Sequence, residues 1–137
     1  MAKELGLGLT VTVDDSSGSG QAISNDITDL TWNMPSGVQD VTGVNKSAHE
    51  RLHLLADFSV SLKGVFNDAS NLSFAIFKNY RTLAASQTGR TTAIAHSGQT
   101  LSNEVLYSDF SFNRNADGSL TWTAPGDLSD GTVPAWA

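Results

Sequence analysis

The sequence lacks cysteine, so neither a disulfide framework nor thiol chemistry contributes to its fold or function. No apolar run approaches the roughly 20 residues of a membrane-spanning helix, and the opening MAKELGLGL lacks the apolar core of a signal peptide. We therefore expect synthesis in a cytoplasm and no membrane partner. Basic residues are also scarce. Eight lysines and arginines oppose fourteen acids, and this net charge of −6 argues against a nucleic-acid binder that neutralises phosphates.

The few charges are unevenly distributed along the 137 residues, a length that suits one domain with its own core. Residues 41–100 carry six bases against three acids, whereas 1–40 carry six acids against one base and 101–137 five acids against one. In a monomer this pattern describes solvated side chains only. In a self-assembling protein, a basic region between two acidic ones gives identical copies complementary surfaces.

Apolar residues that alternate with polar ones predict strands over 5–13, 26–33, 58–66, 90–95, 104–112 and 120–124. Together with one helix, this order predicts an α+β domain built mainly of antiparallel sheet. We expect the strands at 26–33 and 58–66 to pair. Residues 34–57 then form a long loop between neighbouring strands, and loops of that length are usually functional or held by a partner.

The same alternation predicts which side chains face inward. In the second strand, Leu30 and Trp32 share one face and Ile27 lies on the other. In the last hairpin, closed by a turn at Asp117-Gly118, the inward side chains are expected to be Leu106, Phe110, Phe112, Leu120 and Trp122. Residues 126–137 show no periodicity and are interpreted as an extended C-terminal tail outside the sheet. Its Trp136 is expected to dock on this copy or a neighbouring one.

Residues 67–80 are the best helix candidate. Asp68 or Ser70 can cap the first turn, and an apolar stripe follows at three- and four-residue spacing, formed by Leu72, Ala75, Ile76 and Tyr80. Such a stripe is expected to cover a sheet face or fill a seam between subunits.

Residues 45–56 are interpreted as a short helical turn or an ordered loop, because Ser47 and Glu50 have the spacing of a capping box. The run His49-Glu50-Arg51-Leu52-His53 also matches H-E-x-x-H, which on a helix binds zinc through two histidines. Only His96 offers a third imidazole, and the helical pattern stops by Asp57. The capped turn, with solvated or interface histidines, is therefore preferred, and a zinc hydrolase is a remote alternative.

Other chemical signatures are missing. No G-x-S-x-G nucleophile elbow occurs, and no glycine loop that could hold a phosphate precedes a helix. Residues 113–118 imitate the start of a calcium loop, but the twelfth position is Ala124 instead of glutamate. A non-enzymatic alternative is a monomeric β-sandwich that binds a ligand or decorates a virion, using the three tryptophans, Trp32, Trp122 and Trp136, as a platform.

Three runs in this order, VTGVNKSAHERLHLLADFSVSLKGVFN, TLSNEVLYSDFSFNRNADGSLTWTAPG and DGTVPAW, resemble the major tail tube proteins of long-tailed (siphovirus-type) bacteriophages, particularly those of actinobacterial hosts. The resemblance covers most of the chain from Asn25 onward. It implies one domain, residues 1–137, of two packed β-sheets, sandwich- or barrel-like, flanked by one α-helix. It also implies a structural virion protein with no active site, cofactor or metal.

The resemblance further implies hexameric rings that stack into a hollow tail tube, through which genomic DNA passes without specific binding. Tape measure, terminator and distal tail proteins would be its other partners. The long loop would then lie on an adjacent subunit. The expected subunit-interface residues are Lys46, His49, Glu50, Arg51, His53 and Trp136, and the expected lumen-facing residues are Asp26, Asp29 and Asp109.

Overall fold

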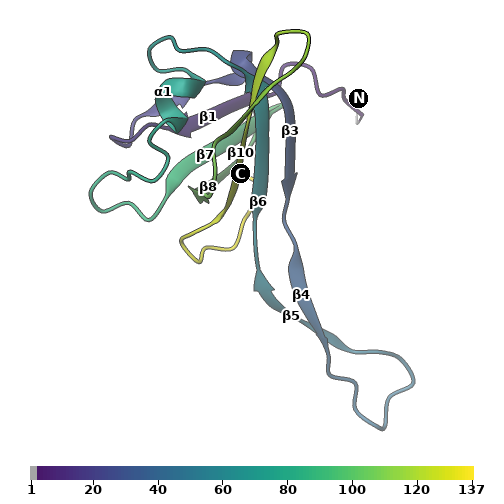
Figure 1. The fold of residues 1–137 in the computed structure, drawn as a ribbon. Helices are drawn as coiled ribbons and strands as arrows, with labels where there is room; N and C mark the ends of the chain where they lie inside the picture. The colour runs from purple at the N-terminus through teal and green to yellow at the C-terminus, as the bar shows by residue number, and fades with distance from the viewer. Residues whose placement is uncertain (1–2) are drawn as a thin grey trace.

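We describe residues 3–137 from a computed structural model of the chain (Figure 1). In chain order, the elements are β1 (Thr10–Asp14), β2 (Gly20–Ala22), the 3-10 turn η1 (Ser24–Asp26), β3 (Ile27–Asn33), β4 (Ser36–Asp40), β5 (Arg51–Ala56), β6 (Ser59–Val65), α1 (Ser73–Phe77), β7 (Arg90–His96), β8 (Gln99–Tyr107), β9 (Ser111–Arg114) and β10 (Leu120–Leu128). The predicted α+β class, mainly antiparallel with one helix, is confirmed. Over these residues, no helix combines the length and apolar character that crossing a bilayer requires.

Eight strands form one antiparallel sheet, and β4 and β5 form a second, two-stranded sheet. The order in the larger sheet is β2-β1-β7-β8-β10-β6-β3, with β9 also on β10. β10 is the branch point, because its first half pairs with β9, its last three residues pair with β8, and β6 pairs along its length. The sheet bends at this strand, so that β1, β7 and β8 face β3, β6 and β10 (Figure 1).

The core lies between the two halves of the bent sheet. Val11 and Ile94 come from one half, Leu62 and Trp122 from the other, and all four are buried. Trp122 also donates its indole N–H to the Val65 carbonyl at 2.8 Å, so its polar atom is satisfied inside the core.

The paired strands at 26–33 and 58–66 are confirmed as β3 and β6, whose ladder runs from Ile27↔Gly64 to Asn33↔Ser59. The side assigned to Ile27 is wrong. The register shifts between Ile27 and Asp29, and this irregularity brings Ile27 to the same core as Leu30 and Trp32.

The first predicted strand is shorter than expected. β1 begins at Thr10, opposite Ala95 of β7, and the turn between β7 and β8 follows soon after that residue. Residues 3–9 therefore have no strand beside them, and Leu5 and Leu7 remain exposed. Alternation indicated strand character here, but a ladder also needs a partner.

The predicted helix over 67–80 is reduced to α1, Ser73–Phe77. Asn71 has a φ of 63°, a left-handed conformation that no helix continues through. Neither Asp68 nor Ser70 caps the helix. Instead, the buried Asp26 carboxylate accepts the Ser73 N–H at 3.1 Å and the Asn67 amide at 2.9 Å. A carboxylate distant in sequence thus accepts the N–H that a local N-cap residue was expected to bind.

The last strands also differ from the prediction. The strand expected over 104–112 is divided into β8 and β9, and within β8 Val105 and Tyr107 face inward while Leu106 is exposed. β10 continues through Pro125 to Leu128, so the first residues of the predicted tail belong to the sheet. Proline has no backbone N–H to donate to a ladder. Pro125 is tolerated because β10 is paired on only one side at this position, with Ser61 of β6. The turn at Asp117-Gly118 is confirmed, with Gly118 at a φ of 95°.

Candidate subunit interface

Residues 34–57 form a hairpin arm that projects from the body of the domain (Figure 1). β4 continues the direction of β3, β5 leads back into β6, and the two pair with each other from Asp40↔Arg51 to Val38↔His53; the register then shifts before the last pair, Ser36↔Ala56. The interpretation of 45–56 as a helical turn capped by Ser47 and Glu50 is wrong. Cross-strand pairing fixes this segment, and the Glu50 N–H bonds to the Thr42 hydroxyl at 2.9 Å.

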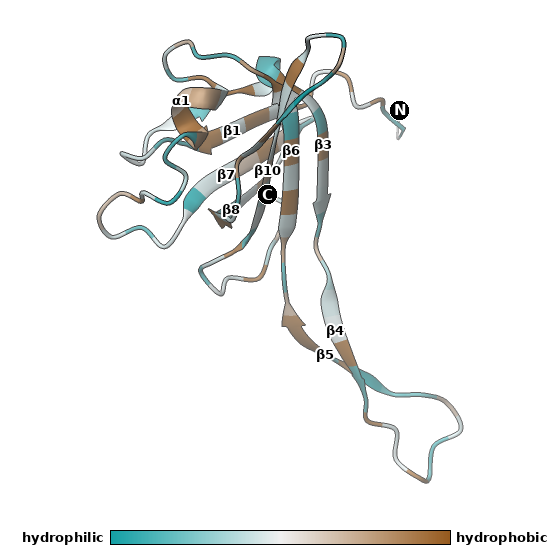
Figure 2. Ribbon diagram, viewed as in Figure 1, coloured by the Kyte–Doolittle hydropathy of each residue, from teal (hydrophilic) through white to brown (hydrophobic). Residues whose placement is uncertain are grey.

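The arm has an apolar face that stays largely exposed within residues 3–137. Leu52 and Leu54 are two residues apart on β5 and thus share a face, with exposures of 59% and 53%. Gly37 lies across from Leu54, because a Cβ placed on it would be 3.1 Å from the Leu54 Cβ. Figure 2 shows the resulting hydrophobic stretch along β5. An alternating strand that buries neither face in its own subunit is expected to do so against another one.

The charged groups near the tip of the arm are paired within it. Lys46 and Glu50 form an exposed ion pair at 3.5 Å, and the His49 ring is 3.0 Å from the Asp40 carboxylate. Hydrogen bonds from the Thr42 side chain, the Thr42 backbone and His49 lower the pKa of Asp40 below its ordinary value. An exposed pair of this kind contributes little stability. The tip is therefore held in shape mainly by backbone pairing and by the Asp40–Thr42 turn.

The H-E-x-x-H pattern does not bring its histidines together. His49 lies in the loop before β5 and His53 lies on β5, where its ring is 3.2 Å from the Ser36 hydroxyl. Four residues of extended chain span about 13 Å, far more than a shared metal ion allows. Residues 3–137 contain no group of three potential metal-ligating side chains. The pattern arises from a strand that alternates polar and apolar residues.

Of the three expected lumen-facing acids, Asp26 is wrongly assigned, because it is 2% exposed and bonds inside the domain. Asp29 is exposed on β3, opposite Lys63 of β6. Asp109 is exposed between β8 and β9, where it accepts the Phe110 N–H at 2.8 Å. The placement of Asp29 and Asp109 in a lumen stays a prediction.

Asp29 belongs to a surface that we call the polar face, the outward side of β3, β6, β9 and β10. Directly opposite residues of an antiparallel ladder share a face, so the register of these strands places hydroxyls and amides together there. Its polar members are Asp29, Thr31, Asn33, Ser59, Ser61, Lys63, Ser111, Asn113, Thr121, Thr123 and Asp127, and Val65 and Pro125 lie among them. Sequence reasoning missed Asp127, because it assigned this residue to a tail. The face is mostly neutral and slightly acidic.

The tail from Gly131 onward returns to its own domain. Trp136 forms an isolated bridge with Leu101, the Thr100 and Ala137 backbones exchange hydrogen bonds at 2.8 Å, and the Trp136 ring lies 6.2 Å from that of Trp32. Docking of Trp136 on its own copy is thus one outcome of the two that we expected, and 41% of its surface stays exposed. The tryptophans do not form one platform, since Trp122 is in the core.

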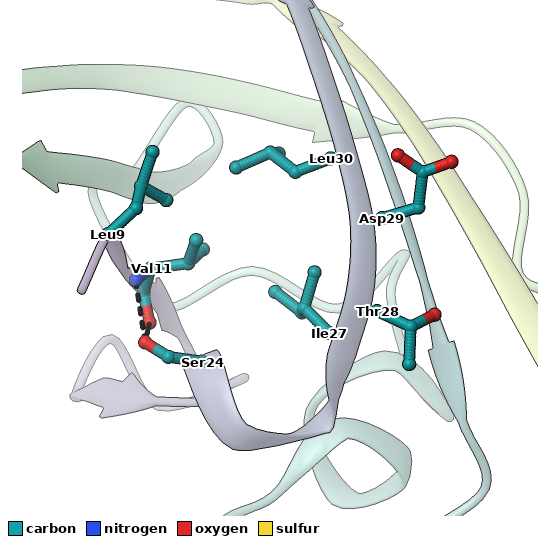
Figure 3. Close-up of a pocket in the computed structure, with 7 residues that line it drawn as sticks. All are labelled: Leu9, Val11, Ser24, Ile27, Thr28, Asp29 and Leu30. Atoms are coloured by element: carbon teal, nitrogen blue, oxygen red, sulfur yellow. Dashed lines mark hydrogen bonds between the residues drawn. The ribbon is translucent and has the colours of Figure 1, made fainter. Parts of the chain in front are cut away.

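The edges of the bent sheet approach each other without pairing. A small pocket lies between β1 and β3, with Val11 and Leu30 on opposite walls, and Ser24 bridges its floor by accepting the Val11 N–H at 2.7 Å (Figure 3). The Asp29 side chain points away from this pocket (Figure 3). The sheet is therefore open and not a closed barrel, and β3 keeps a free edge in addition to its polar face.

All of the predicted interface residues on the arm are exposed: Lys46, His49, Glu50, Arg51 and His53. The structure thus gathers five of the six expected interface residues on one projecting element, and places the sixth, Trp136, on the body. Their contact with another subunit stays a prediction.

No protein-family model matches the sequence, and no curated protein is detectably similar to it. Solved structures do share its fold. A chain from the virion of a native gene transfer agent particle superposes with a TM-score of 0.73 at 13% identity, over 98% of this chain and 99% of that one. A chain from the tail of an empty gene transfer agent particle, refined helically with C6 symmetry, gives 0.70 at 15% identity, over 98% of each chain.

A chain from the six-fold symmetrised baseplate of the anti-feeding prophage superposes with a TM-score of 0.63 at 12% identity, over 100% of this chain and 97% of that one. In all three comparisons the superposition covers nearly the whole of each chain. At these identities the likeness concerns the fold. The chain has the fold of subunits that occur in these tail and baseplate particles.

Proposed function

We propose that this chain is a structural subunit of a phage tail tube, in which hexameric rings stack into a hollow conduit for DNA. The observation that carries the proposal is the arm, whose apolar face alternates like a buried strand and yet has no partner within residues 3–137. The fold shared with a chain from a C6-symmetric tail supports it. The subunit would act in the virion tail without catalysis, beside tape measure, terminator and distal tail proteins.

The polar face would line the conduit. Thr, Ser and Asn side chains dominate it. Its charged groups are one lysine, Lys63, and two acids, Asp29 and Asp127. A phosphate backbone gains affinity mainly from clustered lysine and arginine. A lining with one lysine and a slight acidic excess instead lets DNA pass without specific binding, because no group neutralises phosphates strongly.

The arm would contact an adjacent subunit, with Lys46, His49, Glu50, Arg51 and His53 at or beside the contact. Since the Lys46–Glu50 and His49–Asp40 pairs already satisfy one another, the leucines of β5 would contribute most of the contact energy. Each buried leucine contributes roughly 1.5–3 kcal/mol, repeated around every ring.

Assembly can be tested by negative-stain electron microscopy and sedimentation over a range of protein concentrations. We expect hollow tubes or stacked rings. A strictly monomeric particle at every concentration would contradict the proposal and favour a binding module that uses the exposed Trp136 beside the partly buried Trp32.

An arm variant sharpens the test. Leu52→Ser and Leu54→Ser together remove the apolar face of β5 and leave the backbone ladder between β4 and β5 in place. The variant is expected to keep the wild-type urea unfolding midpoint, since the arm adds nothing to the core, and to form no tubes. Tubes formed as readily as by the wild type would show that the apolar face of β5 is not required.

A further inference from the structure

A group of phenylalanines reaches the surface at the end of the domain opposite the arm. Phe110 and Phe112 have ring centroids 4.6 Å apart, Phe66 lies 6.0 Å from Phe112, and Phe74 of α1 lies 5.1 Å from Phe66. We call this group the aromatic end. Its outer members are open to solvent, with Phe66 39% and Phe112 43% exposed.

The aromatic end and the arm are at the two ends of the same strand. β6 begins at Ser59, directly after the arm, and finishes at Val65, directly before Phe66. In Figure 1 the arm accordingly leaves one end of the body, and the β9–β10 turn and α1 lie toward the other. Repeated copies placed end to end would bring the aromatic end of one copy to the arm of the next.

The arm end of the domain has an apolar cleft that an aromatic ring could enter. It lies between the base of the arm and the C-terminal tail, has a volume of about 390 Å³, and includes Met34, Leu54, Val133 and Pro134 in its lining. Met34 and Val133 are themselves exposed, at 41% and 68%. We call it the arm cleft. Aromatic anchors that fill such pockets are typical of the energetic centre of protein interfaces.

We propose that the aromatic end of one copy docks in the arm cleft of the next, through Phe66 and Phe112 on one side and Met34, Leu54 and Val133 on the other. This inference rests on the proposed tail-tube function and adds the pair of surfaces that joins successive rings. The contact is heterologous, since different surfaces of identical chains meet, and such a contact extends an open filament wherever its rotation does not close a ring. It gives each subunit one donor end and one acceptor end.

Chemistry favours a second copy as the occupant. Both surfaces are apolar, both occur once per chain, and they lie at opposite ends, so one repeated contact covers them both. Lys46 and Glu50, and His49 and Asp40, already contact each other at the arm tip. The apolar face of β5 is therefore the part of the arm that still lacks a contact. A separate tail protein that covers only one of the surfaces would leave the other exposed in every ring.

Cysteine cross-linking tests the contact directly, because the natural chain contains no cysteine. Leu54→Cys and Phe112→Cys proteins are mixed, assembled under reducing conditions and then mildly oxidised. We expect disulfide-linked pairs of the two different chains. The matched control replaces Phe112→Cys with Thr88→Cys, an exposed position in the loop before β7, which is expected to form no such pair above background.

Tubes that form without Leu54–Phe112 cross-links, or that cross-link Leu54 to position 88 equally well, would overturn the inference and leave the tail-tube function intact. A wild-type chain that never assembles would overturn both.

A double-mutant cycle gives an independent readout if the cysteine variants assemble poorly. Leu54→Ala and Phe112→Ala should each raise the protein concentration required for assembly by roughly tenfold, with unchanged urea unfolding as evidence of folding. If the two residues meet, the double variant should be little worse than either single one. Fully multiplicative effects would overturn the contact.

Discussion

Arg90 provides the most searching stability test, because two opposing effects meet on one buried side chain. It is 1% exposed, and its guanidinium donates to the carbonyl oxygens of Ile76, Asn79 at 2.7 Å and Thr82 at 3.0 Å. These carbonyls lie at the end of α1 and in the segment after it. Arg90 thus anchors that segment to β7.

The perturbation is Arg90→Met, which keeps a long apolar stem and removes every donor. Burial lowers the pKa of Arg90, while Asp15, Tyr107 and Asp14 oppose that effect, so the native state bears a desolvation cost that methionine would relieve. Against this, the Ile76 and Thr82 carbonyls lose their donor, whereas the Asn79 carbonyl still accepts the Thr82 N–H; each unsatisfied buried group costs about 1–3 kcal/mol. Taking about 2 kcal/mol for each of the two carbonyls and subtracting about 2 kcal/mol for methionine burial, we expect a net loss of about 2 kcal/mol.

The assay is urea unfolding, followed by the fluorescence of the buried Trp122, with hydrogen exchange of residues 73–82 as a local readout. Arg81→Met is the matched control, since Arg81 is exposed in the same segment and should change stability by less than about 0.5 kcal/mol. If Arg90→Met is as stable as the control or more stable than the wild type, desolvation outweighs the hydrogen bonds and our reasoning is refuted.

Three further predictions concern other positions. Gly64→Ala should cost about 3 kcal/mol or more in urea unfolding, because an added Cβ would overlap the Asp26 carbonyl oxygen; wild-type stability would contradict this close approach. Asp26→Asn should lower the free energy of unfolding by roughly 2 kcal/mol. The two Asp26 oxygens accept hydrogen bonds from Ser73 and Asn67, and the substitution replaces one of these acceptors with an NH2 donor. Unchanged hydrogen exchange at Ser73 would argue against the remote cap. The Asp40 pKa is lowered in the fold, so its turn should be stable above the ordinary aspartate range and loosen only as pH falls through the lowered value. The Thr42 amide resonance should report this, and a change at or above the ordinary pKa would contradict it.

Much of the sheet was predictable from sequence, because period-two alternation reflects burial of one face. β3, β6, β7 and β10 were found within a few residues of their bounds. The errors are at the ends of elements, where alternation is uninformative. Leu5 and Leu7 have the right pattern for a strand but no neighbouring strand to pair with, and pairing is a property of the whole fold.

In the helix and in the arm, long-range hydrogen bonds and strand pairing override the conformation that the local sequence predicts. Leu72 and Tyr80 lie on a reasonable helical stripe, but Asn71 is left-handed and Asp26 of another segment accepts the Ser73 N–H, so α1 begins only at Ser73. In the arm, Ser47 and Glu50 have capping-box spacing, yet the ladder between β4 and β5 decides the conformation. Local propensity is a weak prior wherever long-range pairing is available.

The position of the candidate interface in the chain could be predicted from the sequence, but its three-dimensional structure could not. The length of 34–57 correctly indicated an element outside the core, whereas its apolar face depends on the β5 register, and the arm cleft needs Val133 from the far end of the chain. Asp127 joined the polar face only because β10 extends past Pro125. No pattern near Pro125 indicates that, since proline ordinarily marks a break.

The position of β10 has a consequence for the order in which the protein can be made. β6 and β8 both precede residues 120–128 in the chain, yet β10 is the strand that lies between them. Until β10 is synthesised, a nascent chain has two unpaired strand edges and lacks the central Trp122 of the core. The sheet therefore cannot be completed on the ribosome before residues 120–128 are available to pair.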